Sequence, residues 1–99
     1  MQTQRKTVFL ALQQPLLRTA LELRISQQPD LLLVGDSHEA ETALRLIIAT
    51  QPDIALIEDH PGALNGRELA ARIRSDAPET RIVLLLPHGV RERISDELR

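Results

Sequence analysis

The sequence has no cysteine, and this absence removes several classes of chemistry at once. Disulfides, thiolate metal ligands and thiol nucleophiles all need that residue. Aromatic residues are almost as scarce, because the 99 residues include one Phe and neither Trp nor Tyr. The chain therefore has no aromatic platform on which nucleic-acid bases could stack. Its core must be built from aliphatic side chains.

Long apolar runs are also missing. No stretch approaches the roughly 18 apolar residues of a membrane-spanning helix, and residues 8–12 form too short a run for a signal peptide. The 12 basic and 14 acidic residues nearly balance, whereas a surface that binds nucleic acid normally has a basic excess. We expect a cytoplasmic protein that uses no membrane and does not bind nucleic acid directly through this segment.

A short sequence motif recurs along the chain. The letters QPD occur at residues 28–30 and 51–53, and each copy precedes a short apolar run. A looser copy, APE at residues 77–79, precedes the run at 81–86. Each proline follows a helix-like segment that it would end. Apolar runs without polar alternation are typical of strands buried on both faces of a parallel sheet.

Helical periodicity separates these runs. The predicted order alternates strand and helix, at residues 6–12, 15–27, 31–35, 38–50, 54–58, 65–76, 81–86 and 90–98. Asp36 or Ser37 is expected to cap the second helix, and Asn65 the third. The alternation predicts an α/β fold: one domain over residues 1–99, with a doubly wound parallel sheet and right-handed crossovers.

The second half of the chain resembles a known family. Residues 51–66 read QPDIALIEDHPGALNG, and residues 67–85 continue as RELAARIRSDAPETRIVLL. This stretch resembles the receiver domain of bacterial response regulators, in particular LuxR/NarL-type transcription regulators, and the resemblance covers nearly the whole chain. In that family the stretch reads Pro-Asp, four apolar residues, the phospho-accepting Asp, a loop ending in Asp-Gly, and the third helix. The resemblance implies a flavodoxin-like sheet with strand order 2-1-3-4, and a place in two-component signal transduction.

The functional positions of the family are altered in this chain. A match without gaps puts Glu58 at the phospho-acceptor position. Leu12 and Gln13 stand where the family has the acidic pair that holds Mg²⁺, and Leu86 stands where it has a phosphoryl-binding Ser or Thr. The chain is also truncated before the family's fifth βα unit and the Lys that follows its strand. Because Mg²⁺ favours carboxylates and phosphoryl transfer depends on the metal, the resemblance implies a pseudo-receiver that is no enzyme and needs no cofactor.

Glu58 has two interpretations. It is either a permanent mimic of the phosphorylated state or, as we favour because Leu86 offers it no partner, a solvent-facing acidic residue at a strand end. An alignment shifted by one residue makes Asp59 the acceptor of a conventional phosphorylated receiver. A further alternative is a small-molecule or metal-binding module, whose crevice would be lined by Gln13, Gln14, Glu58, Asp59, His60 and His88.

The missing fifth unit predicts an interaction surface. Residues 82–86 would form an apolar edge strand without protecting charges, and such edges associate with other chains. We expect a homodimer or another protein partner that contacts Ile82, Leu84, Val90, Ile94 and Leu98. Alternatively, residues 90–98 fold over the edge within the same chain. The function predicted from the sequence is thus a regulatory module that acts by binding proteins.

Overall fold

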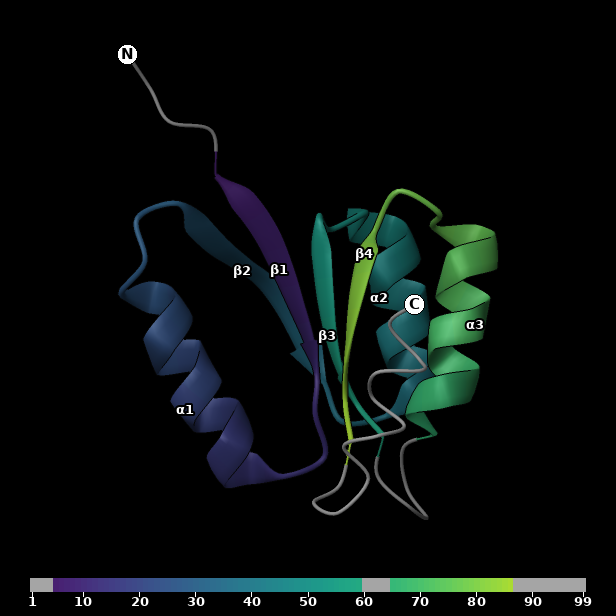
Figure 1. Cartoon of the computed structure of the whole chain (residues 1–99), viewed down its shortest axis with the longest axis horizontal. Coiled ribbons are helices and arrows are strands. Elements are labelled where there is room, and N and C mark those ends of the chain that lie inside the picture. Colours follow the sequence, from purple (N-terminus) through teal and green to yellow (C-terminus); the bar gives the residue numbers. More distant parts are fainter. Residues whose placement is uncertain (1–4, 60–64, 87–99) are drawn as a thin grey trace.

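The computed structural model of the chain describes residues 5–59 and 65–86. Its elements are β1 (Lys6–Ala11), α1 (Pro15–Ser26), β2 (Leu31–Ser37), α2 (Ala40–Thr50), β3 (Ile54–Glu58), α3 (Gly66–Asp76) and β4 (Arg81–Leu85) (Figure 1). The predicted alternation of strands and helices is confirmed for all of these elements. The last predicted helix, at residues 90–98, lies outside the described residues.

The strands form one parallel sheet in the order β2-β1-β3-β4. The sheet is seen nearly edge-on in Figure 1, with α1 on one face and α2 and α3 on the other. The order along the sheet reverses between β1 and β3, because β2 lies on one side of β1 and β3 on the other. In open α/β sheets, ligands bind beyond the carboxyl ends of the strands at such a point.

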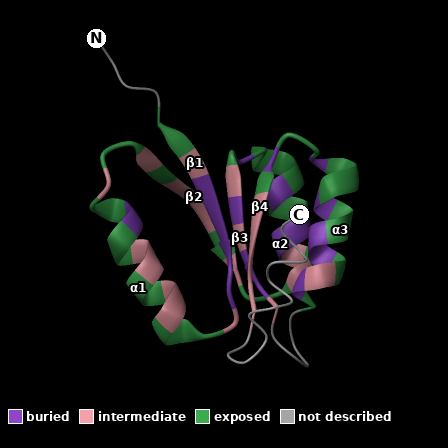
Figure 2. Cartoon of the chain, viewed as in Figure 1, coloured by how far each residue is buried: buried purple, intermediate pink, exposed green. Residues whose placement is uncertain are grey.

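The core has two layers because successive residues of a strand point to opposite faces of the sheet. Phe9 of β1 belongs to the layer under α2 and α3, together with Ile57 and Ile73. Leu10 and Leu12 belong to the layer under α1. Figure 2 shows the buried residues concentrated in β1, in β3 and on the inner sides of α2 and α3. The apolar run of β1 is therefore buried on both sides, as expected for a central parallel strand.

β2 is longer than the sequence predicted and ends at Ser37 instead of residue 35. Its pairing with β1 continues after a register shift between Val8 and Phe9, so that Phe9 pairs with Gly35. A Cβ on Gly35 would lie 2.8 Å from Cε2 of the Phe9 ring. The glycine thus leaves room for the single aromatic side chain of the protein, which is fully buried.

The helix starts agree with the sequence at one site and differ at another. Asn65 caps α3, since its side-chain oxygen accepts a hydrogen bond from the Glu68 N–H at 3.0 Å. The predicted caps of α2 were wrong: Asp36 and Ser37 lie in β2, and the N-cap position is Glu39, which makes no side-chain capping bond. The Ser37 hydroxyl accepts from the Glu39 N–H at 3.1 Å. It therefore fixes the turn that precedes α2 and leaves the helix itself uncapped.

The second QPD motif, at residues 51–53, joins β1 to β3 at the amino edge of the sheet. The Asp53 carboxylate accepts hydrogen bonds from the Thr7 N–H at 2.7 Å and from the Thr7 hydroxyl at 3.1 Å. The Thr7 hydroxyl in turn accepts from the Asp53 N–H at 2.8 Å. The backbone bond from Thr7, followed by the hydroxyl bond, lowers the pKa of Asp53. This motif therefore sets the alignment of β1 and β3 at the edge of the sheet opposite the switch point.

Candidate functional site

Leu12 follows β1 at the carboxyl edge of the sheet, where the resemblance implied an acidic residue. Its side chain is 0% exposed and belongs to the apolar layer under α1, with Leu10 and Ile25. An apolar side chain in this place contributes no ligand atom to the site. A carboxylate here would be buried among aliphatic groups, which is strongly unfavourable.

Glu58, the last residue of β3, is buried with 5% of its surface exposed. Its Oε1 accepts hydrogen bonds from the Gln13 N–H at 2.7 Å and from the Gln14 N–H at 3.2 Å. Its Oε2 accepts from the side-chain amide of Gln14. The favoured expectation of a solvent-facing acidic residue was therefore wrong, because β3 is a central strand and the side chain reaches across to the loop between β1 and α1.

Gln13 and Gln14 thus take part in the site mainly through N–H groups. Gln14 is the N-cap of α1 and Pro15, which has no N–H, begins the helix. The side-chain oxygen of Gln13 is buried and has no hydrogen-bond partner among the described residues. The loop consequently presents donors to Glu58 and no negative charge of its own.

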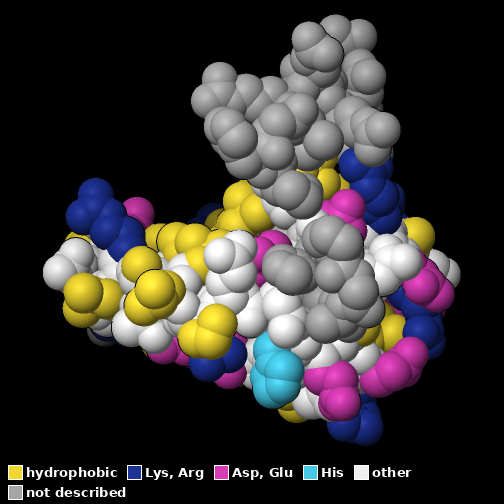
Figure 3. Space-filling model, turned by 90° about the horizontal axis from the view of Figure 1, so that it is seen from below, with side chains coloured by type: hydrophobic (Ala, Val, Ile, Leu, Met, Phe, Trp, Pro, Cys, Tyr) yellow, Lys and Arg dark blue, Asp and Glu magenta, His cyan; other side chains and the backbone are white. Residues whose placement is uncertain are grey.

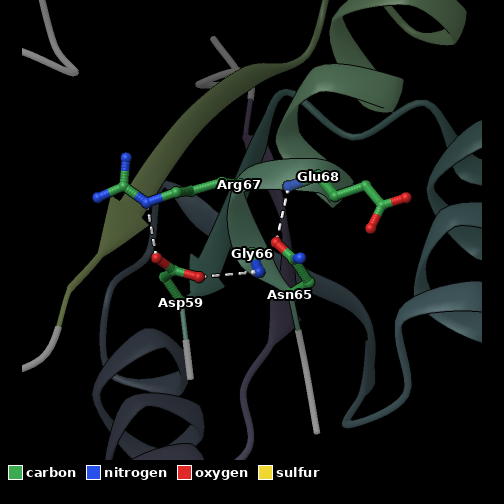
Figure 4. A network of polar contacts seen from close by, with 5 residues as sticks. All are labelled: Asp59, Asn65, Gly66, Arg67 and Glu68. Atoms are coloured by element: carbon green, nitrogen blue, oxygen red, sulfur yellow. Dashed lines mark hydrogen bonds and ion pairs between the residues drawn. The ribbon is translucent and has the colours of Figure 1, made fainter. Parts of the chain in front are cut away.

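Asp59 points away from this cluster toward the start of α3 (Figure 4). Its Oδ1 accepts a hydrogen bond from the Gly66 N–H at 3.2 Å, and its Oδ2 lies 2.9 Å from Nε of Arg67 in an ion pair. Its own N–H donates to the Leu85 carbonyl at 2.8 Å, which continues the pairing of β3 with β4. Neighbouring residues of an extended chain point in opposite directions, so Glu58 faces the β1–α1 loop while Asp59 anchors α3.

Gly66 lies directly against this anchor. A Cβ at Gly66 would be 2.8 Å from Cα of Asp59 and 3.0 Å from the carbonyl oxygen of Glu58. The residue has no room for a side chain, so the close approach of α3 to the end of β3 requires glycine. The first turn of α3 is held on its other side by the Asn65 cap (Figure 4). Sequence reasoning missed this requirement, because Gly66 and Asp59 lie seven residues apart along the chain and meet only in the folded structure.

Of the remaining predicted site residues, the structure describes Leu86 alone. Leu86 follows β4, half-buried and apolar. His60 and His88 lie outside the described residues. Within the described ranges there is no group of three or more His, Asp or Glu residues placed to hold a metal ion. The same ranges contain no helix that is long and apolar enough to cross a membrane.

The interface residues predicted on β4 lie partly in the core. Ile82 and Leu84 are half-buried and pack against the layer under α2 and α3. Leu85 packs against the layer on the α1 side. Val90, Ile94 and Leu98 lie outside the described residues. Side chains of Ile82 and Leu84 are thus used within the fold, and an edge partner would contact mainly the backbone of β4.

Exposed leucines on α1 were not anticipated as a surface feature. Leu16 is 86% exposed and Leu23 is 60% exposed. They are seven residues apart, which places them on the same side of the helix. Figure 3 views the molecule from below, at the carboxyl edge of the sheet, and shows hydrophobic side chains on the α1 side. The sequence did not predict which leucines of α1 are exposed, because apolar residues occur all around the helix, including the side that packs on the sheet.

Known structures resemble this arrangement, although no protein-family model and no curated protein matches the sequence. The signal receiver domain of NarL from Mycobacterium tuberculosis has 29% sequence identity and a TM-score of 0.83, over 96% of this chain and 77% of that one. The fold is that of a response-regulator receiver domain. The response regulator domain of CheB from Thermotoga maritima has 22% identity and a TM-score of 0.80, over 95% of this chain and 72% of that one. The predicted fold class, a flavodoxin-like sheet with the order 2-1-3-4, is confirmed.

A third similar structure is a DNA-binding response regulator of the LuxR family from Staphylococcus aureus. It has 18% identity and a TM-score of 0.80, over 94% of this chain and 78% of that one. In this chain the end of β3 and the loop that follows β1 meet at the switch point, where Glu58 accepts the hydrogen bond from the Gln13 N–H.

Proposed function

We propose that this chain is a regulatory signalling module that resembles a response-regulator receiver, acts by binding other proteins, and is not competent for Mg²⁺-dependent aspartyl phosphorylation. One observation carries the proposal. The carboxylate of Glu58 is already buried and bonded to the β1–α1 loop. The receiver fold supports a signalling role of this kind.

Electrostatics supports the absence of phosphoryl transfer. A phosphoryl group carries a charge near −2 and would have to approach the buried carboxylate of Glu58. Two unit charges of the same sign at 4 Å repel by about 4 kcal/mol at an effective dielectric constant of 20. That is on the order of a thousandfold in rate for each unit of charge. A metal ion would offset this repulsion, but Leu12 and Gln13 supply no carboxylate to hold one.

Exposure to phosphoryl donors tests the proposal. The full chain is incubated with acetyl phosphate or beryllofluoride and Mg²⁺, and is followed by intact mass and by amide chemical shifts. We expect neither an added phosphoryl group nor a Mg²⁺-dependent shift at Glu58 or Asp59. An acyl phosphate on either side chain would overturn the proposal, and on Asp59 it would establish the conventional receiver instead.

A matched variant serves as the positive control. The double substitution Gln13→Asp and Glu58→Asp returns two carboxylates to the loop and strand end and leaves the buried Leu12 unchanged. We expect this variant to gain measurable Mg²⁺ affinity over the unmodified chain, because Mg²⁺ binds carboxylate oxygens. Stabilisation of the unmodified chain by divalent metals alone would favour a metal-binding module.

We further propose a protein partner, with a second copy of the chain as the first candidate, at the outer edge of β4. Within the described residues β4 is hydrogen-bonded on one side only, to β3. Its sequence has a single charge, Arg81, at the first position. The partner would also contact Val90, Ile94 and Leu98, and the absence of cysteine fits a cytoplasmic location.

Size-exclusion chromatography with light scattering tests the homodimer. We expect a dimer that the substitution Val83→Lys weakens, because a charge on an edge strand opposes pairing. The matched control is Thr19→Lys, on an exposed position of α1, which should leave the dimer unchanged. A monomer over the whole concentration range would contradict the homodimer.

A further inference from the structure

Three N–H donors converge at the beginning of α1. They are the backbone N–H groups of Gln13 and Gln14 and the side-chain amide of Gln14. The helix they precede is 12 residues long and starts at Pro15. Gln14 is the N-cap and Gln13 precedes it, so these N–H groups lie at the positive end of the helix dipole, where an anion is favoured.

An anion is in fact seated on these donors. Both oxygens of the Glu58 carboxylate are engaged, with the Gln13 N–H at 2.7 Å as the shorter of the two backbone bonds. The side chain is 5% exposed. Burial of a carboxylate costs several kcal/mol unless donors compensate its charge. Glu58 therefore depends on this loop, and the loop depends on Glu58 to use its donors.

The hydrogen bonds that hold the β1–α1 loop come from a residue that is distant in the sequence. Glu58 lies 45 residues from Gln13 and 44 from Gln14 along the chain. Pro15 favours the extended conformation of Gln14, but the acceptor that engages these N–H groups comes from β3. The carboxylate at the end of β3 is the feature that all three donors share.

We propose that the β1–α1 loop is an oxyanion pocket and that Glu58 is its resident ligand, which holds the loop in a single position. The ligand class of the pocket is a small carboxylate. The inference rests on the proposed function for its meaning in signalling, since a loop fixed in this way has no need of a phosphorylation event to set its position. The binding chemistry itself is independent of phosphorylation.

Removal of the resident carboxylate tests the pocket. The variant Glu58→Ala of the full chain is unfolded thermally in sodium acetate and in sodium chloride at equal ionic strength. We expect the variant to melt below the unmodified chain and to be stabilised by acetate in a saturable manner. At an acetate concentration ten times Kd, its unfolding equilibrium constant should fall by about elevenfold. The unmodified chain should not respond, because Glu58 fills the pocket.

Two further measurements locate the effect. Acetate should shift the backbone amide resonances of Gln13 and Gln14 in Glu58→Ala. The double variant Glu58→Ala, Gln14→Ala lacks the side-chain donor and should bind acetate more weakly. An equal response of the unmodified chain and Glu58→Ala, or unmoved amides at Gln13 and Gln14, would overturn the pocket. Stabilisation by inorganic phosphate without any by acetate would overturn the carboxylate class.

A second variant keeps the test decisive if Glu58→Ala does not fold. Glu58→Gln retains an oxygen for the two backbone donors but presents an amide to the Gln14 amide. We expect it to fold, to be less stable than the unmodified chain, and to ignore acetate because the pocket is filled. A stability equal to that of the unmodified chain would refute a role for the carboxylate charge. An acyl phosphate on Glu58 would refute the proposed function, whereas a missing acetate response would refute only the pocket.

Discussion

The substitution Gly66→Ala probes the contact that seats α3 on the end of β3. The added Cβ would lie 2.8 Å from Cα of Asp59. Ordinary contacts of this type begin at 3.4 Å, so the two segments must separate by 3.4 − 2.8 = 0.6 Å. The atoms in the way belong to the backbone, and Asp59 is held by its bond to the Leu85 carbonyl at 2.8 Å. The strain cannot be relieved by rotation of a side chain.

Two opposing effects set the magnitude of this change. Alanine is favoured over glycine in a helix interior by about 0.8–1 kcal/mol, and less at the first position. Overpacking against a rigid neighbour costs about 1–3 kcal/mol. We expect the clash to dominate, with a net loss of about 1–2 kcal/mol in the free energy of unfolding. For a domain of this size each kcal/mol lowers Tm by about 4–8 °C.

Chemical denaturation followed by circular dichroism measures this loss. The matched control is Ser75→Ala, an exposed position on the same helix, which we expect to be neutral or slightly stabilising. The ion pair between Asp59 and Arg67 should weaken in Gly66→Ala, because the first turn of α3 has to move. A Gly66→Ala variant as stable as the unmodified chain would refute the steric argument.

Three further changes follow from the structure. Gly35→Ala should destabilise the fold by about 1–3 kcal/mol, measured by denaturation, because its Cβ would press on the buried Phe9 ring; an unchanged midpoint would show that the ring can shift freely. Gln51→Gly should stabilise by up to about 1 kcal/mol, since Gln51 ends α2 with a left-handed φ of 48°; a lower midpoint would contradict this. The lowered pKa of Asp53 means that its bonds to Thr7 stabilise the fold above the ordinary Asp pKa of about 3.9 and are lost as the pH falls through the lower folded value. Asp53→Asn should therefore flatten the acid limb of a stability–pH curve, and an unchanged limb would count against the Thr7 contact.

The sequence by itself determined the framework of this protein. The short apolar runs after each proline specify parallel strands, and for the elements within the described residues the predicted ends lie within two residues of those in the structure. The run that ends in Leu12 also determined that the β1 end carries no acidic pair, because an apolar residue next to a buried strand joins the core. The cap at Asn65 was predictable for the same reason: it depends on residues only three positions apart.

Only the tertiary structure decided how the site is used. Glu58 meets its donors 44 and 45 residues away, and the direction of its side chain depends on the position of β3 between β1 and β4. The requirement for glycine at Gly66 and Gly35 likewise comes from neighbours that the fold brings to within 3 Å. Local patterns report which face of an element is apolar, whereas contacts between distant segments depend on the packed geometry. A buried, fully engaged carboxylate and an exposed one therefore have the same appearance in sequence.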